Sequence, residues 1–253
     1  MTKSLRIGCV KYLNARPLIH GWPGDIVLDH PSALCAQLAR GELDIALVSS
    51  FEFLRNPIYQ IVDGVSISSD GPVYSVVVAH AGKISDLKQI GLDPAAQTSG
   101  NLLRCLLSEQ KLNPSFVARS TSSKESGRLL IGDQAIRFRR EHANEFNFWD
   151  LGEQWKKLVD LPFVYALWLV RPEVVDPKSI ADELRALRDK NLANIDRLIA
   201  GQNELDRDFC DRYYHEHLRF SFEEREKNGL RKFSELCQKY DLLPKREVAF
   251  SVV

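Results

Sequence analysis

The sequence predicts an α/β protein in two lobes with a small-molecule site between them. Apolar segments of strand length alternate with helical segments through the first two-thirds of the 253 residues, a pattern typical of βα units. From Ser179 onwards the chain instead has the pattern of charged, amphipathic helices. Hydrophobic residues make up 44% of the sequence, which is enough to bury a sizeable core.

The first elements follow from apolar runs and the residues that end them. Leu5 to Val10 is an apolar run that predicts a buried first strand. A helix is predicted over residues 32–40, because Gly41 stands where a helix commonly ends. Further strands are predicted at 26–28, 43–48 and 73–79. The last of these is a continuous run rich in β-branched residues, as in a buried strand.

A second set of βα units follows, and then the chain returns to the first lobe. Strands are predicted at 90–92, 129–131 and 163–170, with a helix over 100–111 that carries leucines at helical spacing. The last helices are predicted over 179–200, 206–217 and 223–240. We expect one lobe to comprise residues 1–82 and about 175–253, and the other about 83–174. A cleft between such lobes is a favoured place for a ligand.

Charge and cysteine usage narrow the classes of function. Lys plus Arg and Asp plus Glu both number 34, so no basic excess favours nucleic acid or a membrane surface as partner. The five cysteines show no Cys-x-x-Cys spacing, and the histidines show no metal-binding spacing. No apolar stretch of signal-peptide length precedes Cys9, and no stretch has the length of a membrane span. We expect a cytoplasmic protein that needs no metal, nucleotide or covalent nucleophile.

The segment that follows the first strand is the most informative part of the chain. Tyr12, Asn14 and Arg16 come directly after it, and Pro17 disfavours helical geometry at Arg16, which predicts a loop. Ligands of open α/β sheets bind at the carboxyl ends of strands. A phenol, an amide and a guanidinium at that edge indicate a polar, anionic ligand. The alternative is an ordinary surface connection.

Two hydroxyl pairs stand between a strand and a helix. Thr98-Ser99 precedes the leucine-spaced helix, and Ser49-Ser50 precedes a short helical run. Hydroxyls and free N–H groups at a helix N-terminus bind anions well. The alternative is that these residues only cap their own helices. Together with the Asn14 segment, the two pairs favour a carboxylate or phosphate ligand.

Ser75 interrupts a strand of valines. A hydroxyl held on a strand can hydrogen-bond a substrate with little rearrangement. The alternative is a core hydroxyl with a partner inside the protein.

With these residues in hand, the chain resembles the chorismate dehydratase family of the futalosine route to menaquinone. The resemblance covers nearly the whole length and rests on six segments in order, namely 10–18, 41–48, 71–76, 92–93 with 98–99, 131–133 and 161–164. The Tyr12-Leu13-Asn14 segment favours this family over the sister dihydroxynaphthoate synthase. One residue departs from the pattern, since Ala96 stands where the family commonly has serine.

The resemblance implies a fold, a reaction and a set of residues. The fold is that of a type-two periplasmic binding protein, with a central cleft. The reaction removes water from chorismate, without a cofactor, to give 3-[(1-carboxyvinyl)oxy]benzoate. Asn14 and Ser75 match residues important for catalysis, while Thr98, Ser99 and the Ser49-Ser50 turn match positions that face the ligand.

Residue chemistry is coherent with this reaction. Loss of the C4 hydroxyl and a ring proton makes the ring aromatic, so the protein must mainly bind two carboxylates, orient the ring and exclude water. From the residues alone we expect Tyr12 and Arg16 to join the hydroxyl pairs in binding substrate. No histidine or glutamate base is evident, which leaves the substrate's own carboxylate as a candidate base. The rivals are a solute-binding protein, the sister synthase and a ligand-sensing module, and the charged C-terminal helices allow a homodimer.

Overall fold

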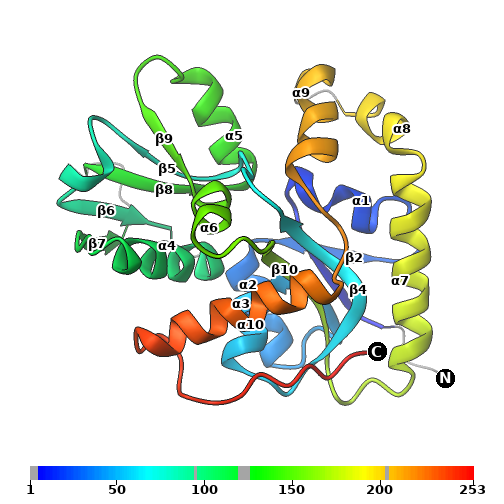
Figure 1. Ribbon diagram of the computed structural model, residues 1–253. Coiled ribbons are helices and arrows are strands. Elements are labelled where there is room, and N and C mark those ends of the chain that lie inside the picture. Colours follow the sequence, from blue (N-terminus) through cyan, green and yellow to red (C-terminus); the bar gives the residue numbers. More distant parts are fainter. Residues whose placement is uncertain (1–4, 94–95, 119–125, 203–204) are drawn as a thin grey trace.

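The computed structural model describes residues 5–93, 96–118, 126–202 and 205–253. Its strands form two separate five-stranded sheets, each covered by helices (Figure 1). We call each sheet with its helices a lobe.

The first sheet has the order β2-β1-β3-β10-β4. Its strands are β1 (Ile7–Val10), β2 (Ile26–Asp29), β3 (Ile45–Ser49), β4 (Gln60–Ser69) and β10 (Phe163–Val170). β1 runs parallel to β2 and β3, whereas β10 is antiparallel to β3 and β4. The carboxyl ends of β1 and β3 therefore share one edge of the sheet.

The second sheet has the order β7-β6-β8-β5-β9. Its strands are β5 (Val76–His80), β6 (Gln89–Leu92), β7 (Ser115–Ala118), β8 (Gly127–Ile131) and β9 (Asn147–Asp150). β6 is parallel to β7 and β8, and β5 is antiparallel to β8 and β9. Here too the carboxyl ends of two strands, β6 and β8, share an edge.

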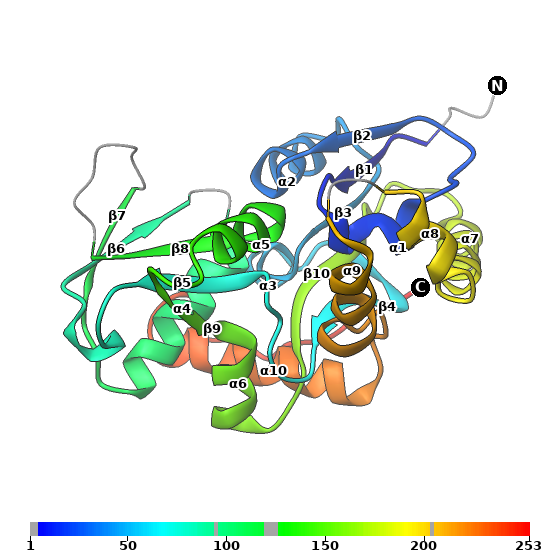
Figure 2. The same ribbon diagram turned by 90° about the horizontal axis from the view of Figure 1, so that it is seen from above.

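Helices follow most strands and pack beside the sheets. The short ones are α1 (Arg16–Ile19), α3 (Ser50–Arg55), α8 (Ile195–Ala200), α9 (Arg207–Arg212), the 3-10 turns Leu13–Ala15 and Ile84–Asp86, and a π-helical turn at Tyr213–His217. The longer ones are α2 (Pro31–Ala39), α4 (Gln97–Glu109), α5 (Gly132–Glu141), α6 (Leu151–Val159), α7 (Pro177–Leu192) and α10 (Glu224–Lys239). α10 packs on β10 and reaches α4 of the other lobe (Figures 1 and 2).

The chain passes between the sheets twice, between β4 and β5 and again between β9 and β10. Sheet membership thus puts Val76–His80 with the second lobe and Phe163–Val170 with the first. Both assignments differ by one strand from the boundaries expected near residues 82 and 174. We propose lobe boundaries at the two crossings, because each strand belongs with the partners that satisfy its hydrogen bonds.

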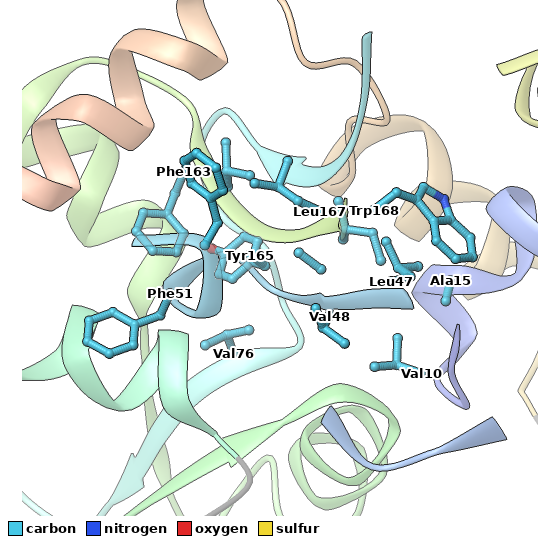
Figure 3. Close-up of a cluster of buried hydrophobic side chains, with 14 of the residues drawn as sticks. Val10, Ala15, Leu47, Val48, Phe51, Val76, Phe163, Tyr165, Leu167 and Trp168 are labelled. Atoms are coloured by element: carbon cyan, nitrogen blue, oxygen red, sulfur yellow. The ribbon is translucent and has the colours of Figure 1, made fainter. Parts of the chain in front are cut away.

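One hydrophobic cluster runs through both lobes. Figure 3 shows side chains from β1, β3, β5 and β10 gathered together, with Val48 and Val76 among them. Trp168 on β10 is fully buried in this cluster. Burial of a shared core fixes the two sheets relative to each other. Among the described residues, no helix is both long and apolar enough to cross a membrane.

Candidate active site

A cavity lies where the carboxyl edges of the two sheets face each other. Together with the open space at its mouth it encloses about 570 Å³, of which about 70 Å³ can hold the centre of a water molecule. Six of the predicted site residues line it, namely Tyr12, Asn14, Ser49, Ser75, Thr98 and Ser99. They come from both lobes and from the first crossing between them, so residues distant in sequence share one pocket.

Arg16 and Ser50, which were also predicted to bind substrate, lie outside this lining. Ser50 is fully buried, and its hydroxyl donates to the carbonyl oxygen of Val164 at 2.7 Å. Arg16 is the first residue of α1 and has helical geometry, with Pro17 in the first turn. The prediction that Pro17 keeps Arg16 out of a helix is therefore wrong. Proline fits the first turn because its missing N–H would have no helical partner there.

The Asn14 segment is held from both sides. The N–H of Leu13 donates to Oδ1 of Asp133 in the second lobe at 2.9 Å, and the hydroxyl of Tyr214 donates to the Leu13 carbonyl at 2.8 Å. The Tyr12 ring packs on Gly132, where a Cβ atom would come within 2.9 Å of it. These contacts fix the backbone on which the Asn14 side chain stands.

Two amide oxygens of the cavity are left for a ligand. Asn14 Oδ1 and Gln97 Oε1 are both buried, and neither has a hydrogen-bond partner in the described part of the chain. Asn14 comes from the first lobe and Gln97 opens α4 in the second. A buried acceptor without a partner is costly, so both indicate a ligand that brings donors.

Ser75 lies just before β5, and not within the strand predicted over 73–79. Its N–H donates to the carbonyl of Val73 at 2.7 Å, across a tight turn in which Tyr74 has a φ of +65°. The Asp150 carboxylate accepts the N–H groups of Val73 and Tyr74 at 3.0 and 2.8 Å. The first crossing is thus bent sharply, which ends the strand early and brings Ser75 to the cavity.

Thr98 does not cap its own helix. Ala96 is the N-cap of α4, which has no side-chain cap bond. Thr98 Oγ1 instead lies 2.5 Å from Ser49 Oγ and accepts the N–H of Phe51 at 3.2 Å. These bonds join β3 and α3 of the first lobe to α4 of the second across the cavity.

The cavity is lined mostly by apolar groups, with hydroxyls and amides among them, and it carries no formal charge. In the part of the chain that the structure describes, its lining has no Asp, Glu, Lys, Arg or His. Burial, with Asp93 and Asp133 nearby, raises the pKa of Tyr12 to about 12, and burial also raises the pKa of Tyr165. Both phenols are therefore neutral at physiological pH.

Two helices begin at the cavity. Gln97 and Gly132 are the first residues of α4 and α5, and both line the cavity. Neither helix has a side-chain cap bond at its N-cap residue. Two helix N-termini that open on one cavity suit an anion with two negative groups.

Sequence reasoning missed several residues of the site. Gln97, Gly132 and Tyr165 line the cavity, and Asp150 and Tyr213 hydrogen-bond the Ser75 region from behind. Gly132 follows an apolar strand directly, and this signal could have placed it at a strand edge. The other contacts depend on pairings distant in sequence.

Comparisons with known proteins agree with this architecture. A family model described as menaquinone biosynthesis matches residues 5–239. The chorismate dehydratase of Thermus thermophilus is 30% identical to this chain in an alignment that covers 90% of this chain and 93% of that protein. The resemblance predicted from the motifs is thereby confirmed.

Solved structures with low identity show the fold. A protein of Archaeoglobus fulgidus has a TM-score of 0.72 at 19% identity, covering 94% of this chain and 98% of that one. The periplasmic aliphatic sulphonate binding protein SsuA of Escherichia coli has a TM-score of 0.64 at 13% identity, covering 96% and 94%. The predicted two-lobed, periplasmic-binding-protein-like fold is confirmed. With its family model matched over most of its length, the chain belongs to the menaquinone biosynthesis family.

Proposed function

We propose that this protein is a chorismate dehydratase that removes water from chorismate to give 3-[(1-carboxyvinyl)oxy]benzoate. The single observation that carries the proposal is the cavity itself, whose polar groups are amides, hydroxyls and two helix N-termini, with no charged side chain among the described residues. The related dehydratase of Thermus thermophilus adds support. The substrate is a dianion with one hydroxyl group, and these groups match what the cavity offers.

The two carboxylates are proposed to bind at the starts of α4 and α5. First-turn N–H groups of a helix have no partner within the helix, and they attract anions. Ser99 lies in the first turn of α4 and lines the cavity, so its hydroxyl can add a hydrogen bond to one carboxylate. Ser49 stands opposite it on the first lobe.

The departing C4 hydroxyl is proposed to lie against Asn14 and Ser75. Asn14 Oδ1 is a buried acceptor without a partner in the described residues, so it can accept the O–H of the substrate. The Ser75 hydroxyl can donate to the same oxygen as the carbon–oxygen bond breaks. Hydrogen bonds that strengthen as charge develops lower the barrier.

Proton removal is proposed to use the substrate itself. The C3–H bond breaks, its electron pair becomes ring π-bonding, and the C4–O bond breaks with loss of hydroxide. A carboxylate of the substrate accepts the C3 proton, because the described lining offers no base that is ionised at neutral pH. That proton and the hydroxide leave as water, and no redox change occurs. The reaction as written needs no cofactor.

The test is incubation of the purified protein with chorismate, followed by mass spectrometry and aromatic absorbance. The expected result is a product lighter than chorismate by one water. Saturable binding of chorismate without any product would instead favour a solute-binding protein of the same fold. If chorismate is neither bound nor converted, the result favours the sister synthase and overturns the proposal. A cytoplasmic location and a homodimer stay predictions.

A further inference from the structure

We propose that Tyr213 is a positioning residue, which orients the Ser75 hydroxyl so that Ser75 donates its proton into the cavity. This inference rests on the proposed dehydratase function and deepens it. Tyr213 begins the π-helical turn that follows α9, drawn in orange in Figure 1, and it is not among the residues that line the cavity.

The contact between the two side chains is direct and buried. The Tyr213 hydroxyl donates to Ser75 Oγ at 2.7 Å, and both residues are fully buried. The two are 138 positions apart in sequence, so the bond joins the C-terminal part of the chain to the first crossing between lobes. The Asn14 side chain also hydrogen-bonds the Tyr213 phenol, so Asn14, Ser75 and Tyr213 lie together at one corner of the cavity.

The Tyr213 hydroxyl is the donor in this hydrogen bond. Burial raises the pKa of Tyr213 above its ordinary value, so the phenol keeps its proton. Once Ser75 Oγ accepts that proton in a hydrogen bond, its own single proton must point elsewhere. The Ser75 side chain lines the cavity, so a bound ligand is the partner that this proton can reach.

The main chain of Ser75 and the ring of Tyr213 are both held in place, so the torsion of the Ser75 hydroxyl is what can still rotate. Ser75 donates its N–H to Val73 and accepts the N–H of Gly132 at 2.8 Å, which fixes its main chain. The Tyr213 ring stacks on Phe209 at 5.6 Å with 17° between the planes. π-helical turns are rare and frequently occur at functional sites. A rigid donor therefore meets a rigid acceptor, and the hydroxyl torsion of Ser75 is set by Tyr213.

Tyr213→Phe tests this role, because the ring stays stacked and only the hydroxyl is lost. The expected result with chorismate is a kcat about tenfold lower with KM within about twofold of the wild type, since the bond acts on the reacting state. In a Ser75→Ala background the same substitution should change kcat by less than about twofold, because its effect passes through Ser75. Tyr213 replaced by 3-fluorotyrosine, which retains a hydroxyl, should retain most of the wild-type kcat.

Tyr59→Phe is the matched control, because Tyr59 is a fully buried phenol outside the cavity lining. Its kcat should equal that of the wild type, and its melting temperature should be similar to that of Tyr213→Phe. A Tyr213→Phe enzyme with unchanged kcat would overturn the inference, as would a rise in KM alone or a 3-fluorotyrosine variant as slow as Tyr213→Phe. A wild-type protein that does not convert chorismate would instead refute the proposed function, so the two failures are distinguishable.

Discussion

The carboxylate of Asp150 accepts the backbone N–H of Tyr74 at 2.8 Å, and Tyr74 has a left-handed φ of +65°. Such a conformation in a residue with a side chain costs on the order of 1–3 kcal/mol and persists only where the surroundings enforce it. Asp150 also caps α6 by accepting the N–H of Glu153 at 3.1 Å. One buried carboxylate thus joins the second crossing to the first, and it places Ser75 at the cavity.

Asp150→Asn should lower both stability and turnover. An amide cannot accept three N–H groups as a carboxylate does, so the free energy of unfolding should fall by about 2–4 kcal/mol. Ser75 should lose its fixed position, and kcat should fall about tenfold. Urea unfolding and initial rates measure the two effects. The control is Asp176→Asn at the exposed N-cap of α7, where asparagine caps nearly as well. If Asp150→Asn had an effect as small as that of Asp176→Asn, Asp150 would not be the residue that fixes Ser75 at the cavity.

Gly132→Ala should damage the site. Gly132 has a φ of +59°, and a Cβ atom there would lie 2.9 Å from the Tyr12 ring. The left-handed geometry alone costs about 1–2 kcal/mol for alanine, and the displaced Tyr12 should raise KM. Gly100→Ala is the opposite case, because the new Cβ meets nothing within 4 Å inside α4. It should raise the unfolding free energy by about 0.5–1 kcal/mol. Thermal unfolding measures the stability of both variants. A change in unfolding free energy of the same sign in both would refute this explanation.

Ala96→Ser should improve substrate binding. Ala96 lines the cavity at the N-cap of α4. An added hydroxyl can donate to the carboxylate proposed for this helix, so KM for chorismate should fall about threefold to tenfold with kcat unchanged. Steady-state kinetics measure this directly. An unchanged or higher KM would mean that no carboxylate lies near residue 96.

Turnover should be independent of pH between about pH 6 and 9, because no described group of the lining titrates there. Burial raises the pKa of Tyr12 to about 12, so its phenol keeps its proton and remains a hydrogen-bond donor below that pH. It loses the proton only above that pH. Below about pH 4 the rate should fall as the carboxylates of the substrate gain protons. A plot of kcat against pH tests this. A limb with an apparent pKa near 7 would reveal a protein base and contradict the proposed proton transfer.

Much of the fold was predictable because its strands are locally distinct. The apolar run 163–170 is β10 as predicted, and the strand predicted at 26–28 lies within β2. β4 (Gln60–Ser69) was missed, because Asp63, Gly64 and Ser66 interrupt its apolar pattern. Its hydrogen bonds with β10 determine that strand, and such pairing cannot be read from local pattern.

The site was predictable to the extent that it depends on strand edges. Asn14, Ser49 and Thr98 lie at or after the carboxyl ends of parallel strands, and all three line the cavity, as this rule predicts for residues at a shared sheet edge. Ser50 was grouped with Ser49, but the start of α3 turns its hydroxyl toward the Val164 carbonyl. The Tyr213 contact with Ser75 spans 138 positions, so no local signal could have indicated it.

The most direct test of the central claim is the rate of chorismate dehydration by Asn14→Ala relative to the wild type. Asn56→Ala, which alters the C-cap of α3 outside the cavity lining, is the control. The account predicts a rate at least about 100-fold lower for Asn14→Ala, with native unfolding behaviour, and a wild-type rate for Asn56→Ala. A folded Asn14→Ala protein that dehydrates chorismate at close to the wild-type rate would contradict it.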